Sequence, residues 1–136
     1  MKLTAFIDGA ARGNPGPAGA GAFFPATENG GAPEELFLSL GRATNNEAEY
    51  RALLLALEQA ERRGATDLSI YSDSLLLVEQ IRGRFRIKAE NLKPLALEAL
   101  HRARKFPRFS ISHVRREKNR DADRLANLGA DGSESR

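Results

Sequence analysis

The spacing of the apolar residues changes part-way along this chain, and that change limits the folds open to it. Residues 2–8, 20–24 and 35–40 are typical of strands, and the connection at 25–33, which contains Gly, Asn and Pro, suits a hairpin. From residue 47 to residue 63 the apolar residues instead recur with the period of a helix. The sequence therefore predicts three antiparallel strands followed by a helix.

Strands and helices alternate along the rest of the chain. The predicted elements are a strand over 67–72, a helix over 74–82, a helix over 91–105, a strand over 109–114 and a helix over 121–128. Such alternation after an initial meander indicates an α/β fold, in which helices pack on a mixed sheet. With 136 residues, of which 41% are hydrophobic, we expect one domain over residues 1–128 and a flexible polar tail over 129–136.

The chain has no cysteine, and no long apolar run follows its first residues. We therefore expect neither a secretory signal nor a membrane-spanning helix. A soluble, cytoplasmic, monomeric protein is the expectation that follows.

Two acidic residues end predicted strands that can lie side by side. Asp8 ends the first strand, and Asp73 follows the strand over 67–72. If these strands are parallel neighbours, both carboxylates reach the edge of the sheet where α/β proteins bind their ligands. Close carboxylates repel each other unless a cation lies between them. A single acid at a turn would be an ordinary surface residue, but the pair favours a metal site.

Glu49 occupies an unusual position on the first predicted helix. It lies on the apolar stripe that includes Leu53, Ala56 and Ala60, so it should face the sheet. An unpaired carboxylate there would cost several kcal/mol, roughly, and therefore needs a partner. An arginine or a metal ion would serve, and the expected proximity of Asp8 favours the metal.

Asp123 joins the acidic group as a candidate, because it lies in the first turns of the last predicted helix, where the helix dipole favours a carboxylate.

The net charge supports a polyanionic partner without establishing one. The overall charge of +3 includes the four acids Asp8, Glu49, Asp73 and Asp123, so the rest of the chain carries +7. Such a surface suits a nucleic acid, although a generic basic surface would look the same.

Four short blocks, taken together, resemble the signature blocks of type 1 ribonuclease H. The blocks are Asp8-Gly9 with Gly13-Asn14-Pro15-Gly16-Pro17, then Thr44-Asn45-Asn46-Glu47-Ala48-Glu49, then Ser72-Asp73-Ser74, and finally Asn119 with Ala122-Asp123-Arg124-Leu125-Ala126. Their order and spacing match the family from the first strand to the last helix. The glycine-rich stretch alone could suggest a dinucleotide loop, but Pro15 and Pro17 prevent the helix that such a loop must open.

This resemblance implies a fold, a reaction and a set of site residues. The implied fold is a ribonuclease H-like, five-stranded mixed sheet, with three antiparallel strands followed by two parallel ones and helices on both faces. The implied reaction is endonucleolytic hydrolysis of the RNA strand of RNA/DNA hybrids, which leaves 5′-phosphate and 3′-hydroxyl ends. The metal ligands that match the family, and that would hold two Mg²⁺ or Mn²⁺ ions, are Asp8, Glu49, Asp73 and Asp123.

The resemblance also implies contacts with the hybrid. Asn14, Asn45 and Asn46 match positions that contact its minor groove, where amides can reach base edges and 2′-hydroxyls. Thr44 matches a contact to a phosphate of the DNA strand. These residues can also form turns and helix caps, and Asn45 can do both.

The chain departs from the best-known bacterial members in two places. Residues 82–91 are too few for the basic protrusion of those enzymes, and residues 115–120 lack their loop histidine, for which Glu117 or a basic neighbour is the candidate substitute. In both respects the chain resembles the subgroup of small archaeal and bacterial type 1 enzymes. Basic residues that could replace the protrusion as a phosphate-binding surface are Arg82, Arg84, Arg86 and Lys88, interleaved with Phe85 and Ile87, and then Lys93, Arg102, Arg104, Lys105 and Arg108. For residues 102–108 a solvated basic face is an equal alternative.

Two other classes of function compete with this interpretation. A non-catalytic module that binds hybrids or double-stranded RNA would keep the basic surface but has no need of four acids. A different nuclease with the same fold, such as a junction resolvase or a proofreading exonuclease, would not need the asparagines at positions 14, 45 and 46.

Overall fold

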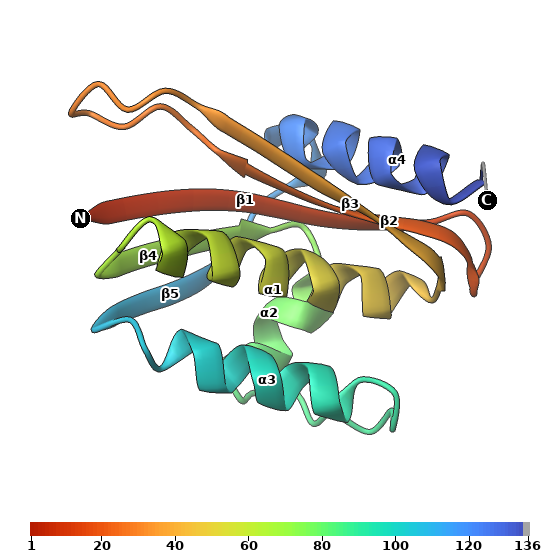
Figure 1. Cartoon of the computed structure of the whole chain (residues 1–136). Coiled ribbons are helices and arrows are strands. Elements are labelled where there is room, and N and C mark those ends of the chain that lie inside the picture. The colour runs from red at the N-terminus through yellow and green to blue at the C-terminus, as the bar shows by residue number, and fades with distance from the viewer. Residues whose placement is uncertain (135–136) are drawn as a thin grey trace.

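The computed structural model describes residues 1–134 and consists of one mixed sheet between two layers of helices (Figure 1). The strands are β1 (Lys2–Ala11), β2 (Gly16–Phe24), β3 (Glu34–Ala43), β4 (Asp67–Ser72) and β5 (Arg108–His113). They lie in the order β3-β2-β1-β4-β5. The pairs β3–β2 and β2–β1 are antiparallel, whereas β1–β4 and β4–β5 are parallel. The predicted five-stranded mixed sheet is therefore confirmed.

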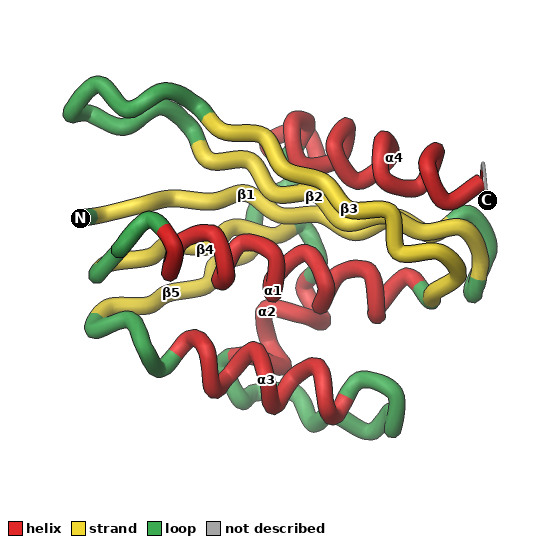
Figure 2. Tube along the Cα trace, in the orientation of Figure 1, coloured by secondary structure: helices red, strands yellow, loops and turns green. Residues whose placement is uncertain are grey.

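Helices cover both faces of the sheet, as predicted. Figure 2 shows α1 (Asn45–Arg62), α2 (Leu75–Ile81) and α3 (Lys93–Ala103) on one side and α4 (Arg120–Glu134) on the other. A short 3₁₀ turn, η1 (Arg116–Lys118), precedes α4. Residues 82–92 join α2 to α3 without another helix. Among the described residues, no helix has the length and apolar character needed to cross a membrane.

The core lies mainly between the sheet and α1. Alternate residues of β1 and β4 point toward this helix, and the apolar stripe of α1 packs against them. Buried members of this core are Leu3, Ile7, Leu53, Leu57, Leu68 and Ile70. Because alternate residues of a strand face opposite sides, the same pleat turns Asp8 away from this core.

The start of α1 is defined by a capping box. The hydroxyl of Thr44 accepts a hydrogen bond from the backbone N–H of Glu47 at 3.1 Å, and the Glu47 carboxylate accepts one from the backbone N–H of Thr44 at 2.8 Å. These two bonds satisfy donors that the first turn of a helix leaves unpaired. Thr44 is therefore the N-cap of α1.

Glycines account for the main differences between the predicted and observed elements. The predicted strands end at residue 8 and begin again at residue 20, but the turn between them occupies only residues 12–15, and β1 and β2 extend to meet it. A Cβ atom on Gly19 would overlap the backbone of Ala126, Gly129 and Ala130 in α4, so this glycine permits close packing of the helix on the sheet. Gly19, a residue type that usually indicates a turn, is here a point of contact between β2 and α4.

The last helix corrects the prediction of a flexible tail after Leu128. Helix α4 continues to Glu134, and residues 135–136 of the predicted tail lie outside the described residues. Gly129 ends the helix in the sequence-based prediction, but it sits where α4 touches Leu38 and Gly19. The Ser133 hydroxyl, 7% exposed, donates to the Ala18 carbonyl at 2.6 Å and accepts from the Gly41 N–H at 2.9 Å. Tertiary contacts therefore hold the end of the helix.

Ser133→Ala should lower the free energy of unfolding by about 1–2 kcal/mol, because it leaves a partly buried N–H and a buried carbonyl without this partner. Urea unfolding followed by circular dichroism measures the change. Ser110→Ala is the matched control, since Ser110 is exposed and its hydroxyl meets the Ser69 hydroxyl at a distance of 3.4 Å, and it should change stability by less than about 0.5 kcal/mol. Equal stability of Ser133→Ala and wild type would restore the flexible-tail interpretation.

Candidate active site

The parallel pairing of β1 with β4 brings the first two acidic residues together. Ile7 lies opposite Ser72 in this register, so Asp8 and Asp73 occupy the next positions along the two strands. Asp8 lies within β1, which continues to Ala11, whereas Asp73 follows the last residue of β4. The Ser72 hydroxyl accepts from the Ser74 N–H at 3.0 Å and shapes the turn that carries Asp73.

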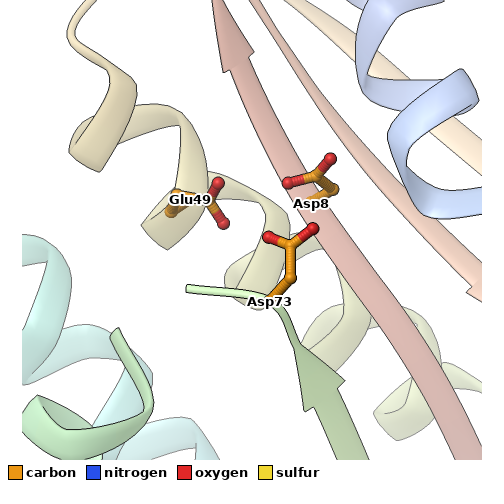
Figure 3. A group of neighbouring side chains, drawn as sticks. All are labelled: Asp8, Glu49 and Asp73. Carbon is orange, nitrogen blue, oxygen red and sulfur yellow. The ribbon is translucent and has the colours of Figure 1, made fainter. Parts of the chain in front are cut away.

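Glu49 reaches the same place from helix α1. A Cβ atom on Gly9 would overlap the backbone of Ala48 and Glu49, so the absence of a side chain at Gly9 lets the first turns of α1 lie directly against β1. Asp8, Glu49 and Asp73 each offer a carboxylate oxygen, and these oxygens lie within 4.8 Å of one another (Figure 3). The sheet and the helix thus build a compact group of three carboxylates.

Burial and mutual repulsion favour protons on this group. Loss of solvent, followed by the charges of Glu49 and Asp73 and by hydrogen bonds with Glu49 and Asp123, raises the pKa of Asp8 to about 10. Loss of solvent also raises the pKa of Glu49 to about 7, against the opposing effect of its hydrogen bond with Asp8. Without a cation, both acids therefore hold their protons more tightly than free carboxyl groups do, Asp8 most of all.

The donor set fits a hard divalent cation. One oxygen of Glu49, Oε2, is buried and has no hydrogen-bond partner among the described residues. An acceptor of this kind carries a desolvation cost that a cation would offset, and carboxylate oxygens are the ligands that Mg²⁺ and Mn²⁺ prefer. Asp8, Glu49 and Asp73 are therefore suited to hold such an ion.

Asp123 lies beside this group and not within it. It is exposed on the first turn of α4, and its side chain lies close enough to that of Asp8 to contribute to the raised pKa of Asp8. Asp121 instead pairs with Arg124 at 3.3 Å, on a part of the helix that also meets Glu35. Of these two acids, the structure brings Asp123 to the other three.

The predicted substrate contacts gather around the start of α1. The side-chain oxygen of Asn14 accepts from the backbone N–H of Asn45 at 3.0 Å, which ties the β1–β2 turn to the helix. Asn45 and Asn46 are exposed in the first turn, and Asn46 lines a crevice that also includes Glu49 and Ser74. Asn14, Thr44, Asn45 and Asn46 therefore border the carboxylates on one side.

Three residues near the site carry roles that the sequence does not reveal. Arg116, in η1, places a positive charge near Glu49 that partly opposes the rise in the pKa of Glu49. Asn119 is 1% exposed, and its side-chain N–H donates to the Ile7 carbonyl at 2.8 Å, directly before Asp8. Asn127 contacts Asp123 and Arg12. Only Asn119 stands in a recognisable motif.

The chain is similar to ribonucleases H over nearly its whole length. A family model described as reverse transcriptase-like matches residues 6–129. Ribonuclease HI of Halobacterium salinarum is 40% identical over 130 residues, which cover 96% of this chain and 65% of that protein. A bifunctional protein of Mycobacterium tuberculosis is 42% identical over 133 residues. The chain spans 36% of the length of that mycobacterial protein.

Solved structures show the same architecture. The crystal structure of RNase H1 from Halobacterium salinarum superposes with a TM-score of 0.90 at 39% identity, and the match covers 97% of this chain and 99% of that one. LC11-RNase H1, solved in complex with an RNA/DNA hybrid, superposes with a TM-score of 0.89 at 35% identity and covers 98% of this chain and 99% of that one.

In metal-free protein, the free energy of unfolding should fall as the pH rises from about 5 to about 9. The native state retains protons on Asp8 and Glu49 that the unfolded chain has released, so their contribution is complete below about pH 4 and is lost as the pH passes about 7 for Glu49 and about 10 for Asp8. The slope is at most about 1.4 kcal/mol per pH unit for each such proton. Urea unfolding in EDTA measures it.

Two additions test the cause of this pH dependence. Asp8→Asn should be more stable than wild type at about pH 8 without metal and should show a shallower slope, because asparagine is neutral in the native state without taking up a proton on folding. Millimolar Mg²⁺ should stabilise wild type most at high pH, where the carboxylates are ionised. A metal-free wild type whose stability is flat or rises over this range would contradict the assigned pKa directions.

Proposed function

The chain belongs to the type 1 ribonuclease H family of hydrolases, and from this premise we propose that it cuts the RNA strand of RNA/DNA hybrids, with divalent cations, to leave 5′-phosphate and 3′-hydroxyl ends. The observation that carries the proposal is the convergence of Asp8, Glu49 and Asp73, with an unpartnered oxygen on Glu49. A scissile phosphodiester is anionic and repels hydroxide, so hydrolysis requires charge neutralisation and an activated water. Two Mg²⁺ or Mn²⁺ ions, when bound, would supply both.

The residues of the chain would divide the remaining work. Asp8, Glu49 and Asp73 would hold the cations, and Asp123 would complete the set from α4. Because the pKa values of Asp8 and Glu49 are raised, these residues would hold cations best at neutral to alkaline pH, where their protons are lost. Arg116 provides a positive charge near Glu49 that would attract the anionic substrate. No nucleophilic side chain takes part in this scheme.

The asparagines near the start of α1 would orient the hybrid. Their exposed amides can donate to and accept from base edges and 2′-hydroxyls in the minor groove, which distinguishes the RNA strand from DNA. Asn14 and Asn45 are linked by a hydrogen bond, so the turn and the helix would act as one surface. Thr44 has its hydroxyl in the capping box, which fixes the side chain toward the helix start.

The segment 84–88 is a second surface for the nucleic acid. Arg84, Phe85, Arg86 and Lys88 are exposed, whereas Arg82 is used within the fold and donates to the Ile111 carbonyl at 2.9 Å. Two backbone bonds to the Glu79 carbonyl, from Arg84 and Phe85, hold the start of the segment. Arg86 and Lys88 form no salt bridge within residues 1–134, so their charges remain available to phosphates.

The basic residues at 102–108 serve the fold more than the nucleic acid. Arg102 pairs with Glu58, Glu61 and Glu98, and Lys105 pairs with Glu61. Arg108 pairs with Asp67 across the β4–β5 edge. Their charges are partly neutralised by neighbours, which favours the interpretation of a solvated basic face.

Asp8→Asn and Asp73→Asn should each abolish detectable cleavage of labelled hybrid, because either change removes a charge that the cations share. Asp123→Asn should lower the rate by at least about a hundredfold, and Asp121→Asn is the matched control, which should remain within about threefold of wild type. The assay includes duplex RNA, duplex DNA and single strands, with and without Mg²⁺ or Mn²⁺. Hybrid binding without cleavage by wild type under every metal condition would favour the binding module instead, and cleavage of duplex DNA would favour a different nuclease.

Replacing Arg84, Arg86 and Lys88 with Ala should weaken hybrid binding. It should also reduce the slope of log Kd against log salt concentration by about 1 for each phosphate that the variant no longer neutralises. Binding is measured in the Asp73→Asn background, so that the substrate stays intact. The control replaces Arg102, Lys105 and Arg108 with Ala and should leave the salt dependence unchanged, because these charges are already paired with acidic neighbours. Equal losses of affinity in the two triple variants would assign the effect to net charge and not to a surface at 84–88.

A further inference from the structure

Asp123 is the one acidic residue of the proposed site whose position does not come from the sheet or from α1. The other three carboxylates form a compact group within 4.8 Å, whereas Asp123 is exposed and stands on α4. An exposed aspartate can adopt several rotamers, so its helix alone does not direct the carboxylate toward Asp8. Contacts near Asp123 must select the orientation in which it faces the site.

The beginning of α4 is fixed by Asn119. The side chain of Asn119 donates to the Ile7 carbonyl of β1, and its backbone carbonyl accepts from the Asp123 N–H at 3.0 Å. The Asn119 N–H in turn donates to the Arg116 carbonyl at 2.9 Å. These bonds fix the backbone of the first turn relative to Asp8, but they leave the Asp123 side chain free to rotate.

Asn127 contacts that side chain directly, one turn further along α4. Its amide nitrogen donates to the Asp123 carbonyl at 2.9 Å and to the Asp123 carboxylate oxygen Oδ1 at 3.4 Å. The bond to the carbonyl is common on helix surfaces and would serve the fold alone. The bond to the carboxylate is different, because it restricts the orientation of an acid that faces the site.

Arg12 determines which end of the Asn127 amide faces Asp123. Its guanidinium donates to the Asn127 side-chain oxygen at 3.3 Å and to the Asn127 carbonyl at 3.4 Å. The same guanidinium pairs with Asp131 at 2.5 Å and with Glu134 at 3.0 Å, so it is itself held in place. With the oxygen directed at the cation of Arg12, the N–H₂ group of the amide must face Asp123.

We propose that Asn127, oriented by Arg12, is a positioning residue that aims the Asp123 carboxylate at the metal-binding group. The chain thereby links the β1–β2 turn, which carries Arg12, to the fourth carboxylate of the site. This inference rests on the proposed function, because it assigns Asp123 a part in cation binding. Supporting partners of a metal-binding carboxylate commonly change affinity or activity by about tenfold or more when they are removed.

The test compares three variants in the full chain. Asn127→Leu keeps the size of the side chain but removes the donor, and it should weaken Mn²⁺ binding to free protein, measured by isothermal titration calorimetry, by about three- to tenfold. It should also lower kcat on hybrid by about tenfold while KM stays within about twofold, since the hybrid contacts lie near α1. Arg124→Ala is the control from the same helix, because its pairs with Glu35 and Asp121 lie away from the site, and it should leave both quantities unchanged. Asp123→Asn is the reference.

The reference separates the two possible failures. If Asp123→Asn keeps wild-type Mn²⁺ affinity and activity, the proposed role of Asp123 is wrong, and with it the basis of this inference. If Asp123→Asn loses both while Asn127→Leu keeps both within about twofold, Asp123 acts but Asn127 does not position it.

A double variant distinguishes positioning from general stability. In the Asp123→Asn background, Asn127→Leu should change Mn²⁺ affinity by less than about twofold, because its target is gone. A further drop equal to that in wild type would show that Asn127 acts independently of Asp123 and would overturn the proposal. Arg12→Leu should shift Mn²⁺ affinity in the same direction as Asn127→Leu, and an unchanged affinity there would remove Arg12 from the proposal.

Discussion

The central constraint in this molecule is the crowding of three carboxylates against a parallel pair of strands. Strands β1 and β4 are neighbours in the middle of the sheet, so Asp8 and Asp73 emerge side by side. Gly9 removes the side chain that would separate β1 from α1, and Glu49 is thereby brought to the same point. Sheet order, helix packing and a single glycine together create a place where negative charge has to be balanced.

The crowding of the three carboxylates lowers the stability of the cation-free protein. The same repulsion favours the binding of a cation. Burial and repulsion raise the pKa values of Asp8 and Glu49, and one Glu49 oxygen lacks any hydrogen-bond partner among the described residues. A fold that needed only stability would place apolar residues here. The surrounding core and the helix caps keep the fold stable despite the repulsion among the three carboxylates. The free energy of cation binding can then compensate for that repulsion.

Helix α4 connects the site to the opposite face of the sheet. It packs closely where Gly19 and Gly129 leave room, and Ser133 anchors its far end to β2 and β3. Asn119 fixes its first turn to β1 just before Asp8. The helix is therefore held at both ends, which gives an exposed residue such as Asp123 a defined distance from carboxylates that belong to other elements.

The sequence by itself determined the types and order of the elements and the identity of the acidic residues near the site. Period-two and helical patterns are local, and acids at the ends of parallel strands must meet at one edge. The tertiary structure alone decided the length of α4 and the surroundings of Arg12, Arg116 and Asn127. Arg12 and Asn127 are 115 positions apart, and no local pattern encodes such a contact. In the sequence, Gly129 likewise indicates the end of a helix. Only the packed structure shows that this glycine instead lies against the backbone of β3.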